Sequence, residues 1–173
     1  MAAFTKLNWG DLDVFAILVG NGIATLEPTF AKRSLAWVSA RGYQIVPIDF
    51  GAGIGPVVSA FGQYFNWEHQ FGYALESSDR NLARLRDGFW YEVPAAGLVL
   101  ELRDLENAFT EDQEWSKGFL GIVSEHSQRQ LALGHRFFAL AHVSNENSPV
   151  VGCALDEKVV PYPYELPRRA PDG

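Results

Sequence analysis

Hydrophobic positions along the chain follow two patterns, short runs that are apolar almost throughout and longer stretches with apolar residues at helical spacing. The runs predict three strands that are largely buried, at Tyr43–Phe50, Leu98–Leu102 and Arg136–Val143, although Pro47 in the first hints at an edge or a bulge. Strands that are separated by helices rather than by tight turns pair in parallel. The pattern therefore predicts an α/β fold with a small, mainly three-stranded parallel sheet flanked by helices. The helical spacing predicts helices over residues 9–19, 29–40, 56–64, 78–89 and 111–133.

The pattern also divides the chain into three parts, which together suit one domain with extensions. Residues 1–42 form a helical extension that we expect to pack on the core, residues 43–143 form the α/β unit, and residues 144–173 form a tail with one further strand. In the first part, Gly22–Leu26 could form a short strand, but Pro28 limits it to an edge or a turn. In the tail, Val150–Leu155 could form another.

The segments between these elements carry fewer signals. Residues 66–77 and 103–110 are predicted to be irregular connections, the first of them rich in aromatic side chains. Asn8 is a candidate cap for the first helix, and Pro56 suits the first helical position after the glycine-rich turn. Gly134 is expected to end the last long helix.

The predicted helix at residues 78–89 is the stretch around which the chain is organised. Leu82, Leu85 and Phe89 fall on one face and meet the core, while Asp87 falls on the opposite, charged face. Ser78 or Asp79 is the expected cap for its first turn. Most helices of this kind are ordinary surface helices, and the alternative is that the charged face docks on a partner.

Composition and charge narrow the class of partner. The chain has 14 basic and 21 acidic residues and a net charge of −7, which disfavours direct binding of nucleic acid and suits a basic protein partner. The only cysteine, Cys153, cannot form a disulfide within the chain, which favours a reducing compartment. Since no secretory signal or membrane-spanning apolar run opens the sequence, we expect a cytoplasmic protein without contact to membranes.

Patterns that carry catalytic chemistry are weak. The turn Gly51–Gly55 reads G-x-G-x-G, which differs from the dinucleotide fingerprint, although glycines between a strand and a helix can approach a phosphate. The four histidines lack the spacing of metal ligands, and no nucleophile elbow is present. We therefore expect no catalytic residues, no metal and no cofactor, and a protein that binds rather than turns over a substrate.

The order of these elements, with the residues that mark them, resembles the barstar family, intracellular inhibitors of the ribonuclease barnase. The resemblance covers about residues 43–143, and it is carried by the spacing of motifs rather than by any one of them. The matching residues are Asn81, Leu82, Leu85, Asp87, Pro94, Leu98–Glu101, Arg103, Glu125 and the final strand RFFALAHV.

The resemblance implies a protein that blocks the active site of a nuclease toxin with the central helix and the loop before it. An acidic side chain then enters the basic pocket that normally holds the substrate phosphate. Carried over to this chain, Asp87 is that acid, Glu125 is a peripheral acid, and Asn81 lies at the start of the helix. The other residues that the resemblance assigns to the contact with the partner are Tyr73, Asp79, Ala83, Arg84, Trp90 and Tyr91.

The chain departs from the family pattern at several positions. Ala83 stands where a second acid is expected, Arg86 stands where an aromatic residue is expected, and Arg80 and Arg84 add positive charge to the face. These departures favour a target other than barnase. Two other classes stay open, an interaction domain or homodimer that inhibits nothing, and a small enzyme that uses the glycine-rich turn or scattered acids.

Overall fold

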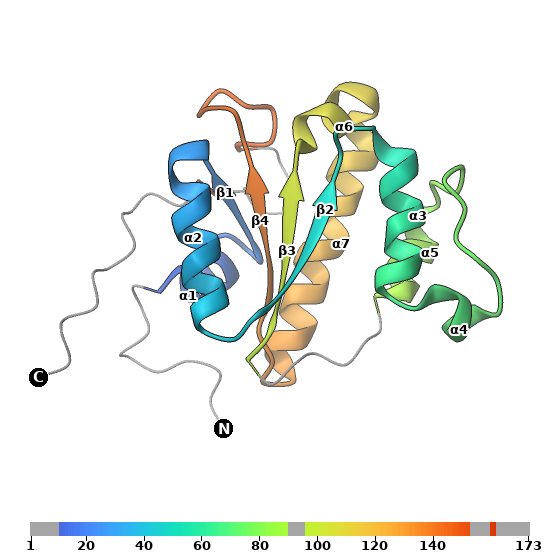
Figure 1. Cartoon of the computed structure of the whole chain (residues 1–173), viewed down its shortest axis with the longest axis horizontal. Coiled ribbons are helices and arrows are strands. Elements are labelled where there is room, and N and C mark those ends of the chain that lie inside the picture. Colours follow the sequence, from blue (N-terminus) through green and yellow to red (C-terminus); the bar gives the residue numbers. More distant parts are fainter. Residues whose placement is uncertain (1–10, 90–95, 153–159, 162–173) are drawn as a thin grey trace, which may run out of the picture.

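The computed structural model describes residues 11–89, 96–152 and 160–161, and it has the α/β architecture that the pattern predicts. Its sheet is parallel throughout, with the strand order β2-β3-β4-β1-β5 (Figure 1). Ile45 lies opposite Val99, and Leu100 lies opposite Ala139. The strands are β1 (Ile23–Leu26), β2 (Gln44–Asp49), β3 (Leu98–Arg103), β4 (Phe137–His142) and the two-residue β5 (Val160–Pro161).

The sheet is larger than the three strands predicted from the sequence. β1 is not an edge, because it pairs with β4 on one side and with β5 on the other, and all four of its residues are buried. Pro28 does not interrupt it, since this residue is the first of the helix that follows. A proline there loses no hydrogen bond, because the first N–H groups of a helix have no partner within it.

Helices cover both faces of the sheet. α1 (Leu12–Leu18) and α2 (Pro28–Ala40) pack on one face, against side chains such as Val99 and Leu140. α3 (Ile54–Tyr64), α5 (Leu82–Gly88) and α7 (Gln113–Ala132) pack on the side of Leu100 and Phe137, so that α2 and α7 lie on opposite faces (Figure 1). Successive side chains of a strand point to opposite faces of the sheet, so the sheet divides the buried residues into two hydrophobic cores, one on each face.

Two short helices lie where connections were predicted. α4 (Trp67–Phe71) interrupts residues 66–77, and α6 (Leu105–Glu111) begins within residues 103–110, two residues after the last residue of β3. The long helix accordingly begins at Gln113, where the side chain of Asp112 accepts a hydrogen bond of 2.9 Å from the N–H of Trp115. Both segments form helices because their buried side chains, such as Trp67 and Leu105, complete the core.

The ends of several elements differ from the sequence prediction. α3 begins at Ile54, so Pro56 is its third residue rather than its first. Residues 150–152 form a turn instead of a strand. Gly134 has a φ of +82°, which suits the predicted end of the long helix. The predicted cap Asn8 and the lone Cys153 lie outside the described residues.

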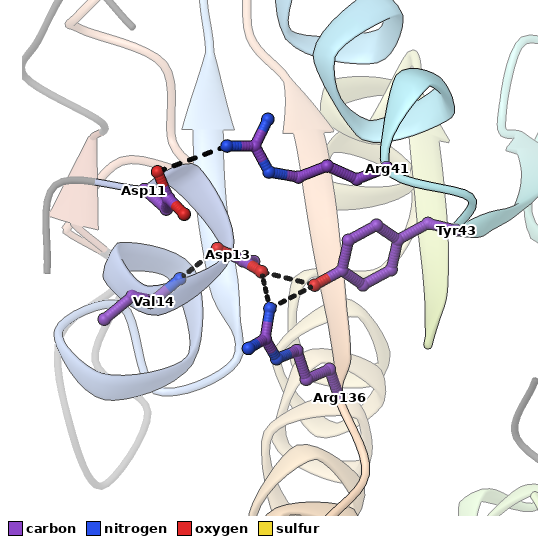
Figure 2. Close-up of polar contacts among 6 residues, drawn as sticks. All are labelled: Asp11, Asp13, Val14, Arg41, Tyr43 and Arg136. Carbon is purple, nitrogen blue, oxygen red and sulfur yellow. Dashed lines mark hydrogen bonds and ion pairs between the residues drawn. The ribbon is translucent and has the colours of Figure 1, made fainter. Parts of the chain in front are cut away.

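A buried cluster of polar groups fastens α1 to the sheet (Figure 2). The carboxylate of Asp13 is fully buried, and it accepts hydrogen bonds from the hydroxyl of Tyr43, from Nη1 of Arg136 at 2.6 Å and from the N–H of Val14 at 2.9 Å. Burial, and then the negative charge of Asp13, raises the pKa of Tyr43. The tyrosine therefore stays protonated and keeps donating.

Across the part of the chain that the structure describes, none of the helices combines the length and the apolarity needed to cross a bilayer.

Candidate functional site

α5 presents the charged face that the sequence predicts. Leu85 and Phe89 are buried in the core, while Ala83, Arg84 and Asp87 are exposed. The helix is shorter than predicted and its cap is Asn81, whose side chain accepts from the N–H groups of Ala83 at 3.0 Å and Arg84 at 3.3 Å. Neither Ser78 nor Asp79 is the cap.

The predicted caps belong to the loop before the helix instead. Asp79 accepts a hydrogen bond of 3.1 Å from the N–H of Asn81, which turns the chain toward α5. Leu75 is buried and fixes the middle of the loop against α3, where a Cβ on Gly62 would lie 3.0 Å from the Cβ of Leu75. The loop and α5 are therefore a single preformed surface.

Three aromatic residues sit beside this surface and divide into two roles. Trp67 is buried, and its ring packs so closely on α5 that a Cβ on Gly88 would lie 1.9 Å from the ring. Phe71 and Tyr73 are 39% and 43% exposed, and their ring centroids lie 4.4 Å and 6.1 Å from that of Trp67. Trp67 therefore pins the loop to the core, whereas Phe71 and Tyr73 are available to a partner.

A shallow cavity of about 440 Å³ opens between the loop and the first turn of α5. Tyr73, Asp79 and Arg84, all predicted to contact the partner, lie around it, together with Glu76. The structure thus brings Tyr73, Asp79 and Arg84 together, with Asp87 one turn further along α5.

The remaining predicted residues lie apart from this cavity. Glu125 is on α7 and reaches α5 through an ion pair with Arg86. Trp90 and Tyr91, with Pro94, lie outside the described residues.

The arginines of this region are all paired with carboxylates. Arg80 pairs with Glu111, Arg84 pairs with Asp79 at 2.5 Å, and Arg86 pairs with Glu125 at 2.9 Å. Glu125 is shared, because Arg129 on the next turn of α7 lies 2.7 Å from its other oxygen.

Asp87 differs from these acids. It is exposed, and its side chain makes no ion pair or hydrogen bond with any residue of the described ranges 11–89, 96–152 and 160–161. It is also the only acidic residue of α5. Among the residues that the structure describes, the carboxylate is therefore presented to solvent without a counter-ion.

Glu111 is a structural residue that sequence reasoning missed. Its Oε2 accepts a hydrogen bond of 2.9 Å from the N–H of Ile54, the first residue of α3, while Arg80 donates to its other oxygen. The first of these bonds, and then the second, lowers the pKa of Glu111. No local pattern could have revealed this contact, because 57 residues separate Glu111 from Ile54.

The carboxylate of Glu111 also lies against the glycine-rich turn at residues 51–55. Gly53 has a φ of +88°, and a Cβ there would lie 2.6 Å from Oε2 of Glu111. The space beside the N–H groups of α3, where a phosphate would bind, is filled by the carboxylate of Glu111. The glycine is needed for the turn and for this close approach, which argues against a phosphate site.

A second cluster of ionisable groups lies at the carboxyl edge of the sheet, where α/β enzymes place their active sites. The buried carboxylate of Glu101 lies 2.7 Å from Nη2 of Arg103. Nε2 of His142 lies 3.3 Å from the other oxygen of Glu101, but the geometry is not that of a hydrogen bond. Burial lowers the pKa of His142. Within the described ranges, no three histidine, cysteine or acidic side chains gather in a way that could hold a metal.

Comparison of the chain with models of protein families, with curated proteins and with solved structures finds no match. The resemblance to the barstar family therefore stays a prediction from the residues quoted above.

Proposed function

We propose that this chain is a barstar-like inhibitor, which binds a nuclease and covers its basic active site with α5 and the loop at residues 72–81. The observation that carries this proposal is the state of Asp87, an exposed carboxylate without a partner among the described residues, on a face where Asp79, Glu111 and Glu125 are each paired with arginine.

A carboxylate presented in this way suits a cleft that binds phosphate. Arginine and lysine side chains that hold a substrate phosphate can hold a carboxylate with the same hydrogen bonds. Since Asp87 has no ion pair within the described residues that would have to break, binding removes chiefly its hydration. A charge that becomes fully desolvated and paired at the centre of an interface is often a hot spot.

The surroundings of Asp87 favour binding in two further ways. α5 is held by the Asn81 cap and by the buried Leu85, so little conformational freedom is lost when a partner docks. The chain carries a net charge of −7, which speeds its encounter with a basic protein.

The arginines that depart from the family pattern do not oppose this function. Arg80, Arg84 and Arg86 each neutralise an acid of the chain itself. The charge presented next to them is therefore that of Asp87, although the pairs change the shape of the surface and favour a target other than barnase.

The test is inhibition of nucleic acid cleavage by titration of the chain into candidate nucleases, namely those encoded beside its gene, those that co-purify with it, and barnase as a reference. We expect one nuclease to be inhibited at one-to-one stoichiometry. Asp87→Ala should raise the inhibition constant about 30-fold or more, as for a hot-spot residue.

Glu27→Ala is the matched control. It removes the same charge from an exposed side chain at the start of α2, on the other face of the sheet, and should leave inhibition unchanged. Equal inhibition by wild type and Asp87→Ala would remove the assignment of this residue. Binding of a nuclease without any loss of its activity would favour the alternative, an interaction domain that inhibits nothing.

A further inference from the structure

A groove of about 800 Å³ crosses the outer surface of α7, between α5 and the turn that joins α1 to β1. Arg86 of α5 forms one wall, and Asn21 of the turn forms the other, where Gln128 donates to it at 2.9 Å. The floor consists of α7 residues that include Gly118, Gly121 and Ser124.

Gly121 has no explanation within the described part of the chain. It lies inside a helix of 20 residues, where glycine is unfavourable, and a Cβ added to it would meet no atom within 4 Å. Gly118, one turn earlier, contrasts with it, because a Cβ there would lie 2.3 Å from the side chain of Leu82. A glycine without an internal reason suits close approach by another molecule.

Ser124 is a second, independent sign of a ligand. It is only 7% exposed and lines the groove, yet its hydroxyl has no hydrogen bond with any residue that the structure describes. Two other serines of the same helix are satisfied, since Ser116 donates to the carbonyl of Asp112 at 2.8 Å and Ser127 to that of Phe137 at 2.7 Å. Within the described part of the chain, the hydroxyl of Ser124 is thus left free on the floor of the groove, where a bound molecule can pair with it.

The size of α5 indicates which molecule this is. With seven residues, α5 is about 10 Å long, whereas a stable protein interface covers about 800 Å² on each partner. An inhibitor interface centred on Asp87 must therefore extend beyond α5. The groove begins at Arg86, the residue next to Asp87, so it is continuous with the proposed interface.

We propose that a segment of the bound nuclease lies in this groove, with its backbone close to Gly121 and a hydrogen bond to the hydroxyl of Ser124. This inference rests on the proposed function, and it names a second contact of the same partner. The rim suits a polar segment, because Gln128 and Asn21 offer amides and Glu125 pairs with both Arg86 and Arg129.

The test compares the affinity of the inhibited nuclease for wild type, Gly121→Gln and Ser124→Ala, measured by titration calorimetry. Gly121→Gln fills the groove without disturbing the fold, because its Cβ meets open space, and should weaken binding at least tenfold. Ser124→Ala should weaken binding about threefold to tenfold through the lost hydrogen bond. Ala36→Gln, at an exposed position of α2 on the other face, is the control and should bind like wild type.

Asp87→Ala in the same titration separates this inference from the proposed function. If Asp87→Ala weakens binding and Gly121→Gln does not, the groove is unoccupied and the inhibitor assignment stands. If Gly121→Gln weakens binding and Asp87→Ala does not, the groove is a docking surface and Asp87 is not the inhibitory acid. A wild-type chain that binds no nuclease overturns both.

Hydrogen exchange gives a second measurement. In the complex, amides at residues 118–128 should exchange more slowly than in the free chain. Protection that is confined to residues 72–88 would overturn the inference even if Gly121→Gln weakened binding for another reason.

Discussion

The hydroxyl of Tyr43, just before β2, donates to the buried carboxylate of Asp13, which lies 30 residues earlier on α1 (Figure 2). Arg136, just before β4, joins them, with its Nη1 2.6 Å from Asp13 and 3.2 Å from the tyrosine oxygen. Tyr43 and Arg136 lie at the amino ends of their strands, opposite the edge where α/β proteins bind ligands. The cluster is therefore a structural tie between α1 and the sheet.

Removing the charge of Asp13 should be costly. Asp13→Asn removes the buried ion pair with the partly buried guanidinium of Arg136, and we expect a loss of about 3 to 5 kcal/mol in the free energy of unfolding. Tyr43→Phe removes one donor and should cost about 1 to 2 kcal/mol. Urea unfolding followed by circular dichroism measures both.

Glu114→Gln is the control for this comparison, because Glu114 forms an ion pair with Lys117 and its side chain is 86% exposed. It should change the free energy of unfolding by less than about 0.5 kcal/mol. A similar small effect for Asp13→Asn would show that the cluster contributes no stability.

The same substitution should have opposite effects at two glycines. Gly121→Ala adds a methyl group in open space and improves helix propensity, so it should raise the free energy of unfolding by about 0.5 to 1 kcal/mol. Gly88→Ala would place its Cβ 1.9 Å from the ring of Trp67 and should cost about 2 kcal/mol or more. Thermal unfolding of the two variants measures both effects. Stabilisation by Gly88→Ala would contradict the close packing of Trp67 on α5.

The strands show how far the sequence determines the fold. β3 and β4 were predictable because each is a run of buried residues, and helices between strands indicated parallel pairing. β2 was predictable as a short apolar run, but it is not buried throughout, since it lies at the edge of the sheet and buries only Val46 and Ile48. β1 was placed at an edge or a turn because Pro28 follows it, although its position inside the sheet is set by pairing with β4 on one side and β5 on the other. Pairing between distant segments leaves no local signal.

The candidate site shows the same limit for side chains. The exposure of Asp87 and the burial of Leu85 follow from helical spacing alone. The pairing of Arg80 with Glu111 does not, since the two residues are 31 positions apart and meet only because α6 ends beside the start of α3. Sequence reasoning therefore found the exposed acid and missed the contacts that neutralise its neighbours.

The buried His126 should make stability depend on pH. Its imidazole packs against the rings of Phe89 and Phe137, with centroids 5.1 Å and 5.3 Å away, and burial, followed by the charge of Arg129, lowers its pKa from 6.5 to about 4. Between these values the unfolded chain binds a proton that the folded chain does not. Stability is therefore lost as the pH falls from 6.5 toward 4.

The expected contribution of His126 is about 2 to 3 kcal/mol between pH 7 and pH 4. Urea unfolding of wild type and His126→Phe across this range measures it, and the variant should show a smaller slope whatever its stability at pH 7. Part of the slope should remain, because burial also lowers the pKa of His142. An unchanged slope would mean that folding does not lower the pKa of His126.

Arg86 provides a test of how the charge around Asp87 acts on a partner. Arg86→Ala leaves Glu125 paired with Arg129, but it adds one net negative charge beside Asp87. If the partner is a basic nuclease, the association rate should increase severalfold at low salt, and the difference should shrink as added salt screens the charges. Lys32→Ala, which removes an equal charge from the exposed side of α2, should change the rate much less. Stopped-flow kinetics at several salt concentrations would decide, and slower association of Arg86→Ala would mean that the arginine itself meets an acidic group of the partner.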